Sequence, residues 1–105
     1  MKINIIVSAA LALLGMAASA QAQDKEALYV KSLAATCANC HGTNGKAVEG
    51  SSVMTLAGLD KSYTIAQMKA FKAGTRPATI MHQLSKGFSD AQIESIAIYF
   101  AAQKK

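Results

Sequence analysis

The chain has 105 residues and a formal charge of +5, and 51% of its residues are hydrophobic. This length is typical of one small domain. The lysines are dispersed along the sequence, and a mild basic excess of this kind does not by itself indicate a nucleic-acid-binding protein. We therefore expect a single small domain with no nucleic-acid partner.

Residues 1–22 have the layout of a secretory signal peptide. An apolar run over residues 5–18 follows a charged start, and two small-residue cleavage patterns end at Ala20 and Ala22. We expect cleavage after Ala22, which leaves residues 23–105 as a periplasmic domain with no membrane span. An uncleaved membrane anchor is the alternative, but the apolar run is short for a span of about 20 residues. Removal of this segment takes away one lysine and no acidic residue, so the formal charge falls from +5 to +4.

The rest of the chain has helical periodicity and no alternating strand pattern, which predicts an all-α domain. Asp24 predicts the start of a first helix that runs to about Thr36. Glycine, asparagine and serine are frequent between residues 41 and 53, which indicates a loop. A second helix is expected from Asp60 or Ser62 to Ala73, because Gly74 follows it at a favourable C-terminal position.

The C-terminal third predicts two further helical segments. The residue before Pro77 avoids the helical region, so an extended step is expected there. A short helical turn over residues 80–86 ends at Gly87. Ser89 and Gln92 have the spacing of a capping box and predict the start of the last helix. The expected buried stripe of this helix consists of Ile93, Ile96, Ala97 and Phe100.

Two cysteines and a histidine form the motif Cys37-Ala38-Asn39-Cys40-His41. A disulfide between these cysteines would close a very small loop, and a zinc site would lack ligands because His82 is the only other histidine. C-x-x-C-H places two thiols on one side of a turn, at the spacing of the vinyl groups on a porphyrin, and directs the next imidazole at the iron. The motif predicts one haem c bound covalently to Cys37 and Cys40, with His41 as an iron ligand.

A buried haem also compensates for a thin hydrophobic core. The whole chain has no tryptophan, three tyrosines and three phenylalanines. Small domains often need a staple such as a disulfide, a metal or a cofactor. A haem supplies a large apolar surface of this kind.

An electron-transfer haem needs a second iron ligand, for which Met54, Met68, Met81 and His82 are the candidates. Met68 lies on the apolar stripe of the second helix, where methionine more often fills the core. Met54 lies only 13 residues after His41, whereas Met81 lies 40 residues after it and has enough chain to reach the opposite face of the haem. Met81 is favoured, with Met54 and His82 as alternatives. A thioether ligand raises the reduction potential relative to a second imidazole.

Several stretches resemble class I cytochrome c. They are Thr36–Gly42, Leu56–Leu59, Phe71–Arg76, Met81 with Ser89-Asp90 after it, and Ile96–Phe100. Within that class the chain is similar to the haem subunit of flavocytochrome c sulfide dehydrogenase. The resemblance implies three to four helices around one covalently bound haem, with the first and last helices crossing. It also implies Met81 as the distal iron ligand and Arg76 as a partner of a haem propionate.

One position departs from the family pattern. Relatives carry proline two residues before Leu-Ala-Gly, where this chain has Met54. In the family, this loop supplies the backbone carbonyl that accepts a hydrogen bond from the second ring nitrogen of the proximal histidine. We expect the Met54 carbonyl to serve in this place, in a less rigid loop. Such a bond orients the ring and sets its basicity as a ligand.

One-electron transfer is the function that these features indicate. No general base or nucleophile is evident, so the chain by itself is not expected to be an enzyme. It is either the haem subunit that accepts electrons from a flavin-containing sulfide dehydrogenase or a diffusing shuttle to a terminal oxidase. A haem-based binder of small ligands is the alternative from another class. Lys61, Lys69 and Lys72 either steer an acidic partner or form a solvated helix face.

Overall fold

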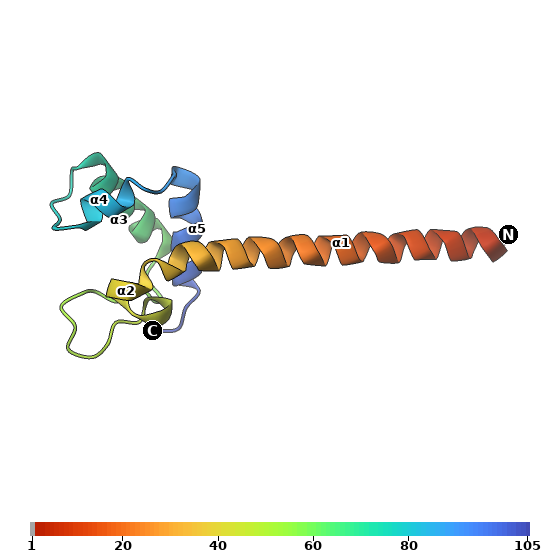
Figure 1. Cartoon of the computed structure of the whole chain (residues 1–105), viewed down its shortest axis with the longest axis horizontal. Coiled ribbons are helices and arrows are strands. Elements are labelled where there is room, and N and C mark those ends of the chain that lie inside the picture. Colours follow the sequence, from red (N-terminus) through yellow and green to blue (C-terminus); the bar gives the residue numbers. More distant parts are fainter. Residues whose placement is uncertain (1) are drawn as a thin grey trace.

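The all-α prediction is confirmed by a computed structural model that describes residues 2–105, apart from the side chains at positions 13, 14, 17 and 18. Within this range no strand is present. The elements, labelled in Figure 1, are α1 (Lys2–Ala35), α2 (Ala38–His41), the 3-10 helix η1 (Thr43–Gly45), α3 (Lys61–Ala73), α4 (Met81–Ser85) and α5 (Asp90–Ala101).

The long helix α1 extends away from the other helices over its N-terminal half (Figure 1). Exposed apolar side chains along this half are Ile3, Ile5, Ile6, Val7, Leu11 and Met16. The helix start expected at Asp24 is wrong, because α1 runs through this residue. The preceding Ala-Gln-Ala-Gln residues favour helix, so nothing breaks it there. Of the helices within residues 2–105, none combines the length and hydropathy needed to cross a membrane.

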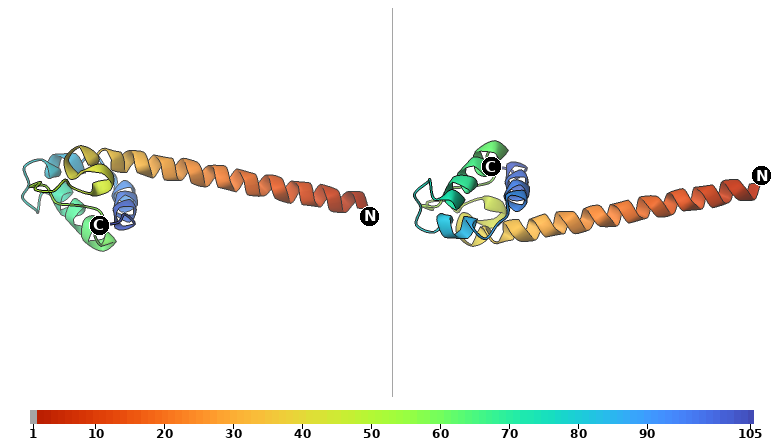
Figure 2. Two further views of the ribbon diagram at one scale, coloured as in Figure 1. Left: turned by 90° about the horizontal axis from the view of Figure 1, so that it is seen from below. Right: turned by 90° about the horizontal axis from the view of Figure 1, so that it is seen from above.

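The core forms where the C-terminal end of α1 packs against α5, as both views in Figure 2 show. Ala34 of α1 is buried in one cluster with Ile96 and Phe100 of α5. All four residues of the expected α5 stripe are buried. The side-chain amide of Gln92 also donates to the Tyr29 hydroxyl across the two helices, at 2.9 Å. The predicted packing of the first and last helices is therefore confirmed.

Side-chain caps set the starts of α3 and α5 where the sequence predicts them. The carboxylate of Asp60 accepts a hydrogen bond from the backbone amide of Tyr63 at 3.0 Å. Gly74 ends α3 with a φ of +75°, a left-handed conformation that suits glycine. At α5, the Ser89 hydroxyl accepts from the Gln92 amide at 3.2 Å, and the Gln92 side chain accepts from the Ser89 amide at 2.9 Å.

Replacement of Ser89 tests the capping box of α5. Ser89→Ala should lower the free energy of unfolding by about 1 kcal/mol, because the backbone amide of Gln92 loses its acceptor. Urea unfolding followed by circular dichroism measures the change. Ser95→Ala, inside the same helix, is the matched control and should shift stability by less than about 0.5 kcal/mol. Equal losses in the two variants would show that the cap has no special role.

Candidate haem site

The C-x-x-C-H segment forms a single turn that directly follows α1. The amide of Cys37 donates to the Ala34 carbonyl at 3.1 Å, which ties the motif to a core residue. The amides of Cys40 and His41 both donate to the Cys37 carbonyl, at 3.3 and 2.9 Å. Residues three and four apart on a helical turn are neighbours on one face. The turn therefore brings both thiols and the imidazole to the same part of the molecule.

The two thiols are free and differ in their surroundings. Cys40 is exposed, whereas Cys37 is half-buried. Burial raises the pKa of the Cys37 thiol above its ordinary value, because desolvation disfavours the thiolate, and the Thr36 hydroxyl offsets part of this effect. Both sulfurs are available for covalent attachment of a porphyrin.

The imidazole of His41 is buried and oriented by one strong hydrogen bond. Its Nδ1 lies 2.6 Å from the backbone carbonyl oxygen of Met54. A carbonyl oxygen can only accept, so Nδ1 is the donor of this bond, and in a neutral imidazole held this way the lone pair lies on Nε2. A neutral imidazole with a free nitrogen is the form that binds a metal ion. The contact expected of the Met54 carbonyl is present.

The loop that carries this carbonyl is held without the family's proline. The carbonyl of Gly45 accepts from the amides of Leu56 and Ala57, at 2.7 and 3.1 Å. The Thr55 hydroxyl accepts a third bond from the Ala47 amide at 3.1 Å. These bonds lie one to three residues beyond Met54, so η1 anchors the segment that orients His41.

Gly45 allows η1 to approach the core closely. A Cβ atom at this position would lie 2.6 Å from Cδ1 of Phe100 and 3.0 Å from Cβ of Leu56. The φ of Gly45 is +76°, which L-amino acids rarely adopt. Glycine at position 45 thus lets the His41 loop rest directly on α5.

A comparison of two glycines isolates this close approach. Gly50 has a similar φ of +79°, but a Cβ there would meet no atom within 4 Å. Both Gly45→Ala and Gly50→Ala incur the backbone strain of a positive φ, and only the former also overpacks the core. Gly45→Ala should therefore lose about 1–3 kcal/mol more in the free energy of unfolding. Urea titration of both variants measures the difference, and equal losses would contradict the close packing.

The second group of candidate ligands lies on α3 and α4. Met68 is buried in α3, and its Sδ accepts from the buried Ser85 hydroxyl at 3.6 Å. This contact agrees with its expected role in the core. Met81 and His82 are the first residues of α4 and are partly buried. The Nδ1 atom of His82 is buried without a hydrogen-bond partner. Met81 as the second iron ligand stays a prediction.

Arg76 lies against α3 in a defined orientation. Its guanidinium stacks on the Phe71 ring, 4.5 Å from the centroid, and Nη1 donates to Oε1 of Gln67 at 2.5 Å. A planar guanidinium has five N–H donors, so several remain for an anionic group. The contact between Arg76 and a haem propionate also stays a prediction.

Two of the three lysines considered for partner steering are engaged within the chain. The ammonium group of Lys72 donates to the Phe88 carbonyl at 2.7 Å and lies 3.3 Å from the Asp90 carboxylate. Lys69 pairs with the same carboxylate at 3.5 Å. The hydrogen bond from Lys72, then the charge of Lys69, lower the pKa of Asp90 below its ordinary value. Asp90 carries one negative charge against two positive ones, so steering of a partner by Lys61, Lys69 and Lys72 stays a prediction.

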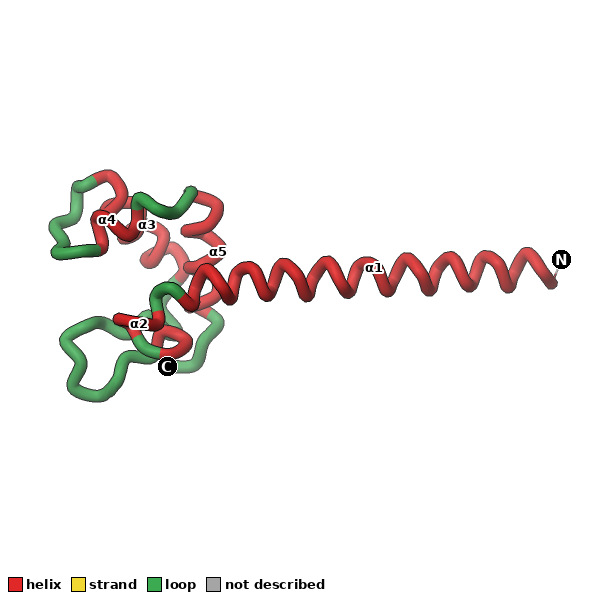
Figure 3. The backbone as a smooth tube through the Cα atoms, in the orientation of Figure 1, coloured by secondary structure: helices red, strands yellow, loops and turns green. Residues whose placement is uncertain are grey.

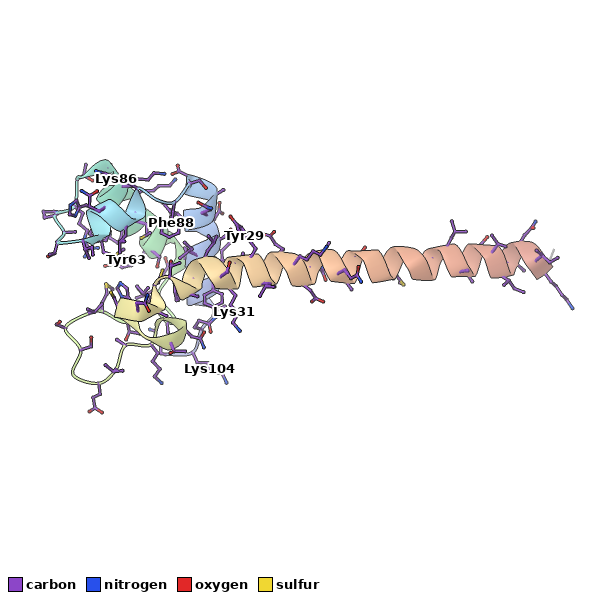
Figure 4. All side chains as sticks on the ribbon, in the orientation of Figure 1. Tyr29, Lys31, Tyr63, Lys86, Phe88 and Lys104 are labelled. Atoms are coloured by element: carbon purple, nitrogen blue, oxygen red, sulfur yellow. The ribbon has the colours of Figure 1, made fainter. Side chains whose placement is uncertain are left out.

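The residues at this site fit a haem. In the view of Figure 3, α2 and the loop after it lie below, and α3 with α4 lie above. Apolar side chains that remain 43–54% exposed include Met54, Tyr63, Ile80 and Leu84. Tyr63, labelled in Figure 4, belongs to the first turn of α3. Two free thiols, an oriented imidazole and uncovered apolar surface suit a covalently bound porphyrin.

Comparison with known proteins agrees with this chemistry. Residues 27–103 match the family model described as Cytochrome c. The thiosulfate dehydrogenase electron acceptor of Stutzerimonas stutzeri (strain A1501) is 30% identical over 93 residues, 85% of this chain and 43% of the relative. The cytochrome subunit of sulfide dehydrogenase of Chlorobaculum tepidum is 34% identical over 73 residues, 70% of this chain and 64% of the relative. The chain thus spans less than two thirds of both relatives.

A shorter relative is matched over most of its length. Cytochrome c-554(548) of Halomonas halodenitrificans is 33% identical over 72 residues, which are 66% of this chain and 86% of the relative. A cytochrome c domain implies a covalently bound haem c, and Cys37 and Cys40 fit the attachment motif. The resemblance derived from the sequence is confirmed.

Proposed function

The chain belongs to the cytochrome c family, and on that basis we propose that it is a periplasmic single-haem carrier that accepts electrons from a dehydrogenase of reduced sulfur compounds. The hydrogen bond between His41 Nδ1 and the Met54 carbonyl, at 2.6 Å, is the observation that carries the proposal. It leaves the other ring nitrogen free to ligate iron. His41 also directly follows the C-x-x-C segment, whose two cysteines are free. The predicted signal peptide at residues 1–22 supports export.

Each residue of the site has a distinct task. Cys37 and Cys40 would hold the haem covalently, and His41 and Met81 would ligate its iron. When bound, the haem supplies one-electron chemistry, because its iron alternates between the ferric and ferrous states. The Met54 carbonyl keeps the imidazole in one tautomer and raises its basicity. Proteins of this family carry electrons for their partners rather than catalyse a reaction themselves.

The names of two relatives support a sulfur-oxidising partner. One is a cytochrome subunit of sulfide dehydrogenase and another is a thiosulfate dehydrogenase electron acceptor. We place a flavin-containing sulfide dehydrogenase first, because this chain covers 64% of the former relative and only 43% of the latter. Thiosulfate dehydrogenase is the second candidate. A freely diffusing shuttle to a terminal oxidase remains the alternative mode of action.

Purification from the native host tests the choice of partner. A stable one-to-one complex with a flavin-containing chain supports the sulfide dehydrogenase subunit, whereas a monomer on sizing supports a diffusing carrier. Addition of sulfide or thiosulfate with the matching dehydrogenase should then reduce the haem, followed by its visible absorption. Reduction by neither system would contradict a sulfur-oxidising partner.

Replacement of Met81 tests the second iron ligand. Met81→Ala should remove the weak near-infrared sulfur-to-iron band, lower the reduction potential and open the iron of the reduced protein to carbon monoxide, because a thioether ligand is lost. Absorption spectra, potentiometry and carbon monoxide titration measure these changes. Met54→Leu is the control, since it keeps the backbone carbonyl and should leave the band in place. An unchanged spectrum in Met81→Ala would refute this ligand.

A further inference from the structure

The helix that carries Met81 depends on its neighbours for its position. α4 has only five residues, and no side chain caps its start at Ile80. Such a short helix is unstable alone, because few hydrogen bonds repay the ordering of its backbone. The segment before it runs through the exposed residues Pro77, Thr79 and Ile80. Contacts with α3, which lies beside α4 in Figure 1, therefore fix where Met81 lies.

Two polar contacts join α4 and the turn after it to α3. The first is the buried bond from the Ser85 hydroxyl to the sulfur of Met68, at 3.6 Å. The second is the bond from the Lys72 ammonium group to the Phe88 carbonyl, at 2.7 Å. The Phe88 amide donates in turn to the Ser85 carbonyl at 3.3 Å. Phe88 thus links the Lys72 ammonium group to Ser85, the last residue of α4.

Lys72 makes a main-chain contact that its neighbour Lys69 lacks. Both ammonium groups lie within 3.5 Å of the Asp90 carboxylate, but only that of Lys72 also bonds to the main chain. The side chain of Lys72 is 32% exposed, against 51% for Lys69. A hydrogen bond from a charged donor to a carbonyl contributes more than an exposed ion pair does.

We propose that Lys72 is a positioning residue for Met81. By holding the Phe88 carbonyl, its ammonium group keeps α4 against α3 and retains the thioether of Met81 at the iron. This inference rests on the ligand role proposed for Met81. Without the bond, α4 would move away from α3 more often, and Met81 would ligate the iron for less of the time.

Two lysine variants of the haem-loaded protein test this role. Lys72→Met and Lys69→Met each remove one positive charge beside Asp90, so their electrostatic effects on the haem are matched. Lys72→Met should bind carbon monoxide to the reduced protein about tenfold faster, the size expected for one charge-assisted hydrogen bond. Its near-infrared band in the oxidised protein should also vanish at a temperature below that of helix unfolding. Lys69→Met should stay close to wild type in both measurements.

Equal carbon monoxide rates in the two variants, with the near-infrared band intact in both, would overturn the role of Lys72 and leave Met81 as the ligand. A wild-type protein that lacks the band and binds carbon monoxide as fast as Met81→Ala would overturn the ligand assignment itself. Lys72→Gln repeats the comparison if Lys72→Met yields no haem-loaded protein. Its shorter neutral side chain loses the charged contact, so a wild-type rate in this variant would also overturn the inference.

Discussion

The hydrogen bond from the His41 imidazole to the Met54 carbonyl is the interaction on which the site depends. Its acceptor is a backbone atom in a loop, so its position is only as fixed as the loop itself. That loop is bonded to η1 through Gly45, and Gly45 lies against Phe100 in the core of α1 and α5. The packing of two helices far apart in sequence thus determines the orientation of one ring nitrogen.

The protein part of this domain has little core of its own. The buried cluster is small, and large apolar side chains near the site remain exposed on both sides of it. Burial of apolar surface is the main favourable term in folding, so covering these exposed side chains would raise the free energy of unfolding. Covalent haem would cover it and join the α2 loop to α3 and α4. Haem bound to this surface would therefore stabilise the folded chain.

Local signals in the sequence predicted much of this arrangement. Asp60, Gly74 and the pair of Ser89 and Gln92 mark helix ends through bonds within a few residues, and the structure contains those bonds. The attachment motif is equally local. Contacts between distant residues left no such signal. The bond from Lys72 to the Phe88 carbonyl spans 16 residues, and η1 forms where tertiary contacts hold it, so the sequence predicted only a loop there. The continuation of α1 through Asp24 was missed because an N-cap residue is also tolerated inside a helix.

The continuity of α1 has a consequence for a processed chain. In the full chain, Asp24 and Glu26 lie well inside the helix, where its dipole has little effect on them. In a chain that begins at Gln23, the same carboxylates would lie in the first turn, next to unpaired backbone amides. Negative charges in that place stabilise a helix by about 0.3–1 kcal/mol each. Removal of residues 1–22 would thus place these two surface acids at the N-terminal end of the helix, where their negative charges stabilise it.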